Sequence, residues 1–145
     1  MQVNPKITFF IPDLENPIPT SFISGGIKAG FPSPAADFEE LKLSLDHLLV
    51  KNREATFYAK ASGNSMIGAG IDDGDILVID RSLEPRNNAI AVCLIDGEFT
   101  VKRIKKDNEE VYLIPENSQY QPIKIEEENE LIIWGIVTYA IKQMK

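Results

Sequence analysis

The chain of 145 residues is long enough for one domain of ordinary size with an additional arm. Hydrophobic residues make up 43% of it and charged residues 26%, a balance typical of a folded protein rather than a disordered one. The net charge of −7 disfavours direct, sequence-specific DNA binding, because phosphate contacts require clustered lysine and arginine.

The first 36 residues carry six of the nine prolines. Proline lacks a backbone N–H and fixes φ, so this segment is predicted to be extended and to form neither a helix nor a central strand. Its apolar residues, among them Phe9, Phe10 and Phe22, predict that it lies against a surface. Residues 1–19 hold no apolar run long enough for a signal peptide or a membrane span, which predicts a cytoplasmic protein.

The remainder of the chain is predicted to be mostly β. A short helix is expected over residues 44–50 with Ser44 as its N-cap, and Asp96-Gly97 is a hairpin signal. Short apolar runs between turn residues predict strands at 56–59, 75–80, 89–95, 98–104, 111–115 and 131–139. The expected architecture is a compact β domain with one short helix, preceded by an extended N-terminal arm.

Most catalytic and metal chemistries lack the residues they need. Cys93 is the only cysteine and is expected to be a small buried hydrophobe, and His47 is the only histidine and is expected to be structural. No zinc motif and no phosphate-binding lysine motif is present, so no metal and no cofactor is predicted. The acidic residues Asp72, Asp73 and Asp75 lack the spacing of a calcium loop and are interpreted as a solvated turn.

A serine and a lysine remain as candidates for nucleophilic chemistry. Ser65 lies in a small-residue turn, Ser62-Gly63-Asn64-Ser65, where tight backbone can expose a hydroxyl and direct amide groups at an oxyanion. Lys102 shares one face of its predicted strand with Thr100 and Ile104, and desolvation there would lower its pKa. By themselves these patterns favour an ordinary turn and a solvated strand lysine over a catalytic pair.

Four ordered segments resemble the LexA/UmuD family of self-cleaving serine peptidases, peptidase family S24, and its UmuD branch most closely. They read AGFPSPAADF, KASGNSMIGAGIDDGDILVID, DGEFTVKRI and LIPENSQYQPI. The resemblance runs from about Gly30 to the C-terminus, and the two candidate residues stand 37 positions apart, as it requires. The order of the four segments makes the resemblance specific, whereas any one of them alone would not.

The resemblance implies a Ser-Lys dyad that cuts its own chain. Ser65 would be the nucleophile and Lys102 the general base, and the bond cut would be Ala29–Gly30. Backbone amides near Asn64 and Ser65 would form the oxyanion hole. Residues 1–29 would be the arm removed by self-cleavage, 30–43 an extended segment after the cut, and 44–145 the peptidase-like β domain.

The resemblance also implies partners and a setting in the SOS response to DNA damage. A RecA filament on single-stranded DNA would stimulate the cut, and the product, expected to be a homodimer, would join a Y-family translesion polymerase subunit of the UmuC-like kind. Only 29 residues precede the expected cut, and they show no helical pattern, which disfavours a DNA-binding repressor.

Two alternatives remain open from sequence. The chain could be a non-catalytic interaction module of the same fold that uses its arm as a binding strand. It could also be a dyad enzyme acting on other proteins, as signal peptidases do, although no membrane anchor supports that interpretation.

Overall fold

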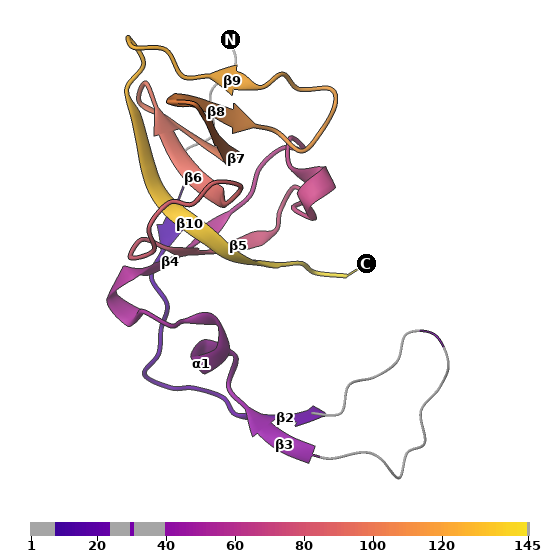
Figure 1. Ribbon diagram of the computed structural model, residues 1–145. Coiled ribbons are helices and arrows are strands. Elements are labelled where there is room, and N and C mark those ends of the chain that lie inside the picture. Colours follow the sequence, from indigo (N-terminus) through magenta and orange to yellow (C-terminus); the bar gives the residue numbers. More distant parts are fainter. Residues whose placement is uncertain (1–7, 24–29, 31–39, 145) are drawn as a thin grey trace. The chain divides into compact units, whose positions relative to one another are not determined.

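The computed structural model describes residues 8–23, 30 and 40–144, which fall into two compact units (Figure 1). The larger unit comprises Met1–Pro12 and Asn52–Lys145, and the smaller comprises Asp13–Lys51. No helix in the described part of the chain is both long and apolar enough to cross a membrane.

The larger unit is one antiparallel sheet of eight strands, which confirms the mostly β prediction. In spatial order the strands are β1 (Phe9–Phe10), β4 (Thr56–Lys60), β5 (Ile76–Asp80), β10 (Leu131–Ile141), β6 (Ile90–Ile95), β7 (Glu98–Asp107), β8 (Glu110–Ile114) and β9 (Ile123–Lys124). Two short 3-10 helices, η2 (Arg53–Ala55) and η3 (Ile67–Ala69), lie before and after β4 along the chain. All six predicted strands are present.

The hairpin between β6 and β7 forms where the sequence predicted it. Asp96 and Gly97 both have positive φ, 49° and 83°, as a two-residue turn that matches strand twist requires. Strand β7 runs to Asp107, beyond the predicted end at residue 104, although its last three residues are exposed. Its backbone continues to pair with β8, because the hairpin turns only at Asn108 and Glu109.

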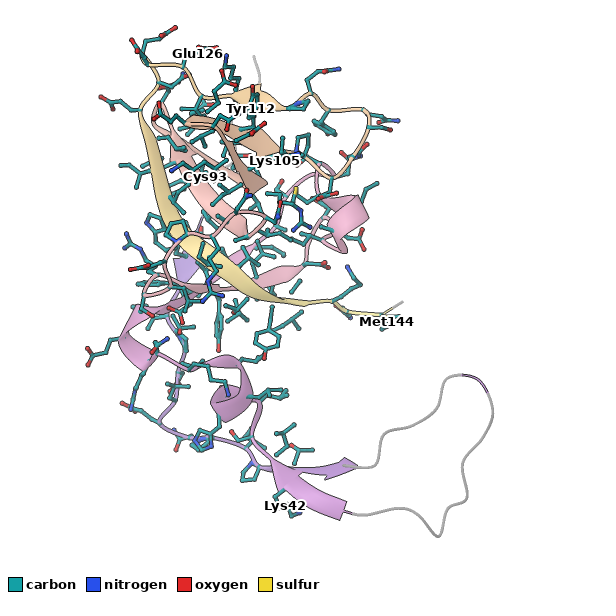
Figure 2. All side chains as sticks on the ribbon, viewed as in Figure 1. Lys42, Cys93, Lys105, Tyr112, Glu126 and Met144 are labelled. Carbon is teal, nitrogen blue, oxygen red and sulfur yellow. The ribbon has the colours of Figure 1, made fainter. Side chains whose placement is uncertain are left out.

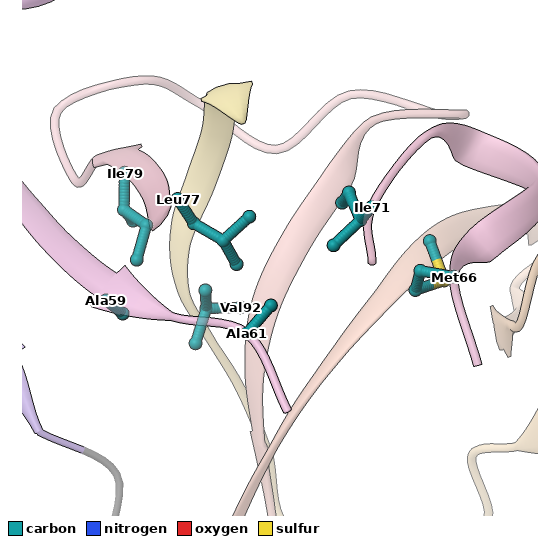
Figure 3. Close-up of a cluster of buried hydrophobic side chains, with 7 residues drawn as sticks. All are labelled: Ala59, Ala61, Met66, Ile71, Leu77, Ile79 and Val92. Atoms are coloured by element: carbon teal, nitrogen blue, oxygen red, sulfur yellow. The ribbon is translucent and has the colours of Figure 1, made fainter. Parts of the chain in front are cut away.

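Two groups of buried side chains make up the core of the sheet. Figure 3 shows the first, which gathers side chains from β4, β5, β6 and the loop after β4: Ala59, Ala61, Met66, Ile71, Leu77, Ile79 and Val92. The second includes Cys93, Ile104 and Leu113. Cys93 is fully buried within the sheet (Figure 2), which confirms its predicted role as a small hydrophobe.

The smaller unit contains strands β2 (Thr20–Ile23) and β3 (Glu40–Leu43), which pair antiparallel, and helix α1 (Leu45–Leu49). The short helix is confirmed with Ser44 at its N-cap position, but the Ser44 hydroxyl makes no capping hydrogen bond and is buried without a partner. Sequence patterns did not predict β2 and β3. Their flanks are rich in proline, which is unfavourable for strands, and the two strands pair only across a 16-residue connection.

The proline-rich segment behaves in part as predicted where it is described. Strand β1 pairs only with β4 and therefore occupies the edge of the large sheet, not its centre. The prediction that its apolar residues lie against a surface is confirmed for Phe9, which packs against the first core group, but not for Phe10 and Ile11, which are 51% and 76% exposed. The side chains of Phe22 and Ile23 lie outside the described part of the structure.

Candidate active site

The loop that carries Ser65 follows β4 and is fixed at both ends by the core. Gly63 adopts a φ of +89°, which favours glycine, and its N–H donates to Asp73 Oδ1 at 2.8 Å. Met66, the residue after Ser65, is only 3% exposed and points into the first core group (Figure 3). Ser65 therefore lies between an anchored glycine turn and a buried methionine, with its own side chain half-buried.

A second segment, residues 115–120, holds the same loop through hydrogen bonds. The Glu116 N–H donates to Ser65 O at 2.8 Å, and the Gly68 N–H donates to Glu116 O at 2.8 Å. A side chain at position 68 would meet that carbonyl, because its Cβ would lie 2.6 Å from Glu116 O. Asn117 Nδ2 donates to Asn64 O at 2.8 Å, and Tyr120 OH donates to Asn64 Oδ1 at 2.5 Å. The serine loop is thus held on both of its flanks.

Lys102 reaches Ser65 from the middle of β7. Its Nζ donates to Ser65 Oγ at 3.2 Å, to Thr100 Oγ1 at 2.7 Å and to the Val101 carbonyl at 3.1 Å. The alternation of β7 explains the contact with Thr100, which lies two residues away on the same face. All three partners are uncharged, and no ion pair among the described residues includes Lys102.

The environment of Lys102 favours its neutral form. The residue is 8% exposed, and this burial lowers the pKa of its amine below the ordinary value for lysine. The neighbouring Cys93 thiol would oppose the shift only as a thiolate. Burial raises the pKa of Cys93 to about 11, so the thiol stays protonated under most conditions. The lysine is therefore desolvated without a charged partner to compensate.

A neutral Lys102 amine would have one lone pair and two N–H groups. The Val101 carbonyl can only accept, and Thr100 Oγ1 can accept the second N–H, so both hydrogens have partners. The lone pair is then left for the Ser65 hydroxyl, which would donate to it. This arrangement has the geometry of a general base facing a nucleophile.

A cleft of about 510 Å³ adjoins Ser65. One wall comes from the end of β4 and the serine loop, and another comes from residues 97–101 on β7 and the turn before it. The backbone N–H groups of Asn64 and Ser65 donate no hydrogen bond to any other described residue. Such donors are the kind that an oxyanion hole uses.

The structure places the remaining predicted residues as follows. Gly30 belongs to the smaller unit and is exposed, and Ala29 lies outside the described residues. His47 is exposed on α1, also in the smaller unit. The prediction of a solvated acidic turn is wrong for Asp75, which is 4% exposed. Its carboxylate accepts from the Asp72 N–H at 2.8 Å and from Lys142 at 2.5 Å.

Sequence reasoning did not identify four residues as parts of this site. Glu116, Asn117 and Tyr120 hold the serine loop, and Phe9 lines the cleft from β1. The motif LIPENSQYQPI was noted in the sequence, but only the pairing of its backbone with the serine loop reveals what it does. No sequence pattern near Phe9 predicts its position in the site, because the rings that it contacts lie on strands about 90 and 125 residues away in the chain.

The sequence of the chain matches a known protein family and several known proteins. The pattern of the family described as Peptidase S24-like matches residues 21–138. Protein MucA of Salmonella typhimurium is 41% identical over 116 residues, 79% of each chain. Protein SamA of the same species is 39% identical over 117 residues, 81% of each chain. Protein ImpA, also from Salmonella typhimurium, is 37% identical over 119 residues, 81% of this chain and 80% of that protein.

Proposed function

Because this chain belongs to the Peptidase S24-like family and has UmuD-like relatives, we propose that it is a serine peptidase that cuts its own Ala29–Gly30 bond. The observation that carries the proposal is the contact between Lys102 Nζ and Ser65 Oγ at 3.2 Å beside an open cleft. Ser65 is the nucleophile and Lys102 the general base.

The reaction is an acyl transfer in two steps. Neutral Lys102 takes the proton of Ser65 as Oγ attacks the Ala29 carbonyl carbon, and the oxyanion accepts from the N–H groups of Asn64 and Ser65. The C–N bond then breaks, and Lys102 returns the proton to the amine of Gly30. Water, deprotonated by the same lysine, hydrolyses the acyl-enzyme, which frees the Ala29 carboxylate and restores Ser65.

Because the substrate bond is part of the chain, its effective concentration at Ser65 is high and the limiting event is its placement in the cleft. A partner can therefore stimulate cleavage by favouring the competent conformation of the arm. We assign this role to a RecA filament on single-stranded DNA. The product, residues 30–145, then acts as a homodimeric accessory subunit of a UmuC-like Y-family translesion polymerase in SOS mutagenesis, in the cytoplasm.

Intact-mass spectrometry of the full chain tests the peptidase directly. The protein is held at neutral and at strongly alkaline pH beside Ser65→Ala and Lys102→Ala, because high pH deprotonates Lys102 without any partner. A species that begins at Gly30, formed faster at high pH and only by the parent chain, is the expected result. A parent chain that stays intact at both pH values and with RecA filaments would refute the proposal and favour a non-catalytic interaction module.

A further inference from the structure

The arm segment that would be lost on cleavage forms part of the large sheet. Strand β1 pairs with β4 in antiparallel register, Phe9 opposite Ala59 and Phe10 opposite Tyr58. Phe10 is 51% exposed, whereas Phe9 is half-buried and lines the cleft beside Ser65. The two adjacent phenylalanines therefore differ in role, and Phe9 is the one that attaches the arm to the domain.

The Phe9 ring occupies an aromatic slot built by two distant strands. It stacks on Trp134 of β10, with ring centroids 4.1 Å apart at an interplanar angle of 24°. It meets the Phe99 ring of β7 edge-on at 5.2 Å. The Phe99 and Trp134 rings also meet each other edge-on, with centroids 6.2 Å apart, so Phe9 packs into the corner that they form. This corner, together with the outer edge of β4, is called the aromatic groove below.

The groove is held in shape by contacts that do not involve the arm. Trp134 is the extra residue of a β-bulge against β6, since the register passes from Ile133 to Gly135, and such bulges redirect a side chain. Arg81 lies over the Trp134 ring at 4.3 Å, and its Nε donates to Trp134 O at 2.9 Å. Phe57 meets the same ring edge-on at 5.2 Å. The groove therefore does not depend on Phe9 for its walls.

The contact that β1 makes is small. It consists of two paired residues and one aromatic side chain, whereas Ile11, the next residue, is 76% exposed. A segment that binds weakly stays bound while it is tethered, because the tether supplies an effective concentration on the order of mM. Once the tether is cut, the same contact is exchangeable.

We propose that the aromatic groove is a binding site for an extended peptide that carries an aromatic side chain, and that Phe9 of the arm fills it in the intact chain. The ligand adds a strand to the edge of β4, in the manner of β-strand addition, and packs its ring against both Phe99 and Trp134, as Phe9 does. The groove opens when β1 leaves. That this happens on cleavage at Ala29–Gly30 rests on the proposed function.

The test uses full-length chains with Ser65→Ala, so that none of them can cut itself. The probe is a fluorescein-labelled synthetic peptide with the sequence of residues 5–14, PKITFFIPDL. Its Kd is measured by fluorescence anisotropy against the Ser65→Ala parent and against the same chain with Phe9→Ala or Phe10→Ala. Phe10 is the matched control, because it is adjacent in the strand and mostly exposed.

The Phe9→Ala chain is expected to bind the probe at least tenfold more tightly than the parent or the Phe10→Ala chain, because its own arm no longer fills the groove. A probe with alanine in place of Phe9 should not bind. Trp134 is the only tryptophan and reports on the same event, since its quenching by acrylamide should increase in Phe9→Ala and fall when the probe binds.

Equal binding of the probe to all three chains, or no binding to Phe9→Ala, would overturn the proposal. Phe9→Leu keeps an apolar side chain and decides the question if Phe9→Ala does not fold; the proposal then requires tighter probe binding than the parent shows. Because no chain in this experiment needs to cleave, its failure leaves the peptidase proposal standing. Conversely, a parent chain that stays intact at both pH values and with RecA filaments refutes the peptidase without affecting the groove.

Discussion

Two regions of the sheet each hold a lysine, and they place it in opposite electrostatic surroundings. Lys102, in mid-strand on β7, is buried among uncharged partners, and burial lowers the pKa of its amine. Lys142 follows the end of β10 and pairs with Asp72 at 2.7 Å and Asp75 at 2.5 Å. These hydrogen bonds raise the pKa of Lys142. The comparison shows how one residue type becomes a base in one place and a structural cation in another.

The difference lies in what each amine would lose by giving up its proton. Deprotonation of Lys142 would leave Asp75, a nearly buried carboxylate, without its cation. Deprotonation of Lys102 removes a charge that no described carboxylate compensates, and it leaves two N–H donors for two fixed acceptors. Of these two lysines, only Lys102 has a lowered pKa, and only Lys102 forms a hydrogen bond with the Ser65 hydroxyl.

The largest expected effect separates the two lysines by activity. Arginine stays protonated at every accessible pH, so Lys102→Arg should slow self-cleavage by about 10²–10⁴-fold, the usual contribution of a general base. Lys142→Arg keeps its charge and its carboxylate partners and should cleave at the parent rate. Rates are followed by intact mass from neutral to alkaline pH. If both variants cleave themselves equally slowly, the different surroundings of the two lysines do not account for their roles in cleavage.

For stability, Lys142 should matter more than Lys102. Lys142→Met leaves the Asp75 carboxylate buried without a cation and should lower the free energy of unfolding. Lys102→Met replaces a desolvated amine by an apolar side chain of similar length and should be neutral or stabilising. Both are measured by urea denaturation in the Ser65→Ala background. Lys124→Met, at the exposed pair with Glu110, is the control and should lower stability less than Lys142→Met does, because solvent screens an exposed pair.

Rising pH should change the contributions of the two lysines to stability in opposite directions. The folded pKa of Lys142 is raised, so its contribution is complete below the ordinary lysine pKa and is lost as pH rises through the folded value. The folded pKa of Lys102 is lowered, so its cost is complete below that folded pKa and disappears as pH rises toward the ordinary value. Asp75, whose pKa Lys142 lowers, should lose its contribution as pH falls through its folded pKa.

A smaller effect is expected from the residue that orients Lys102. Thr100→Val removes the acceptor of one Nζ hydrogen bond without changing the side chain's shape, and it should slow cleavage about tenfold, equivalent to about 1.4 kcal/mol. Thr100→Ser should restore the rate, which a merely structural role for the threonine methyl would not predict. Thr138→Val, on β10 with its own bond to Val78 O, is the matched control.

The smallest effect should come from Cys93. Its thiol, with a pKa raised to about 11 by burial, should not react with iodoacetamide at neutral pH unless the protein is unfolded. Cys93→Ala should cost about 1 kcal/mol of stability and leave the pH midpoint of cleavage unchanged, because a protonated thiol exerts no charge on Lys102. A shifted midpoint in this variant would show that the thiolate helps to set the lysine pKa.

The local features of this protein could be predicted from its amino-acid sequence. Strand alternation placed Thr100, Lys102 and Ile104 on one face, and Asp96-Gly97 determined the hairpin that brings β7 against β6. These follow from backbone geometry within a few residues. The resemblance of four segments supplied the expected roles of Ser65 and Lys102, which spacing alone could not have assigned.

Which of these side chains are buried, and which residues they contact, depends on the packing of the whole sheet. Burial of Lys102 depends on the strands packed around it, the hold on Ser65 depends on Glu116, and the burial of Asp75 depends on Lys142, 67 residues away. The position of Phe9 depends on rings at 99 and 134. Desolvation and aromatic packing depend on neighbours in space. A pattern along the chain does not identify those neighbours, because they come together only when the strands pack into the sheet.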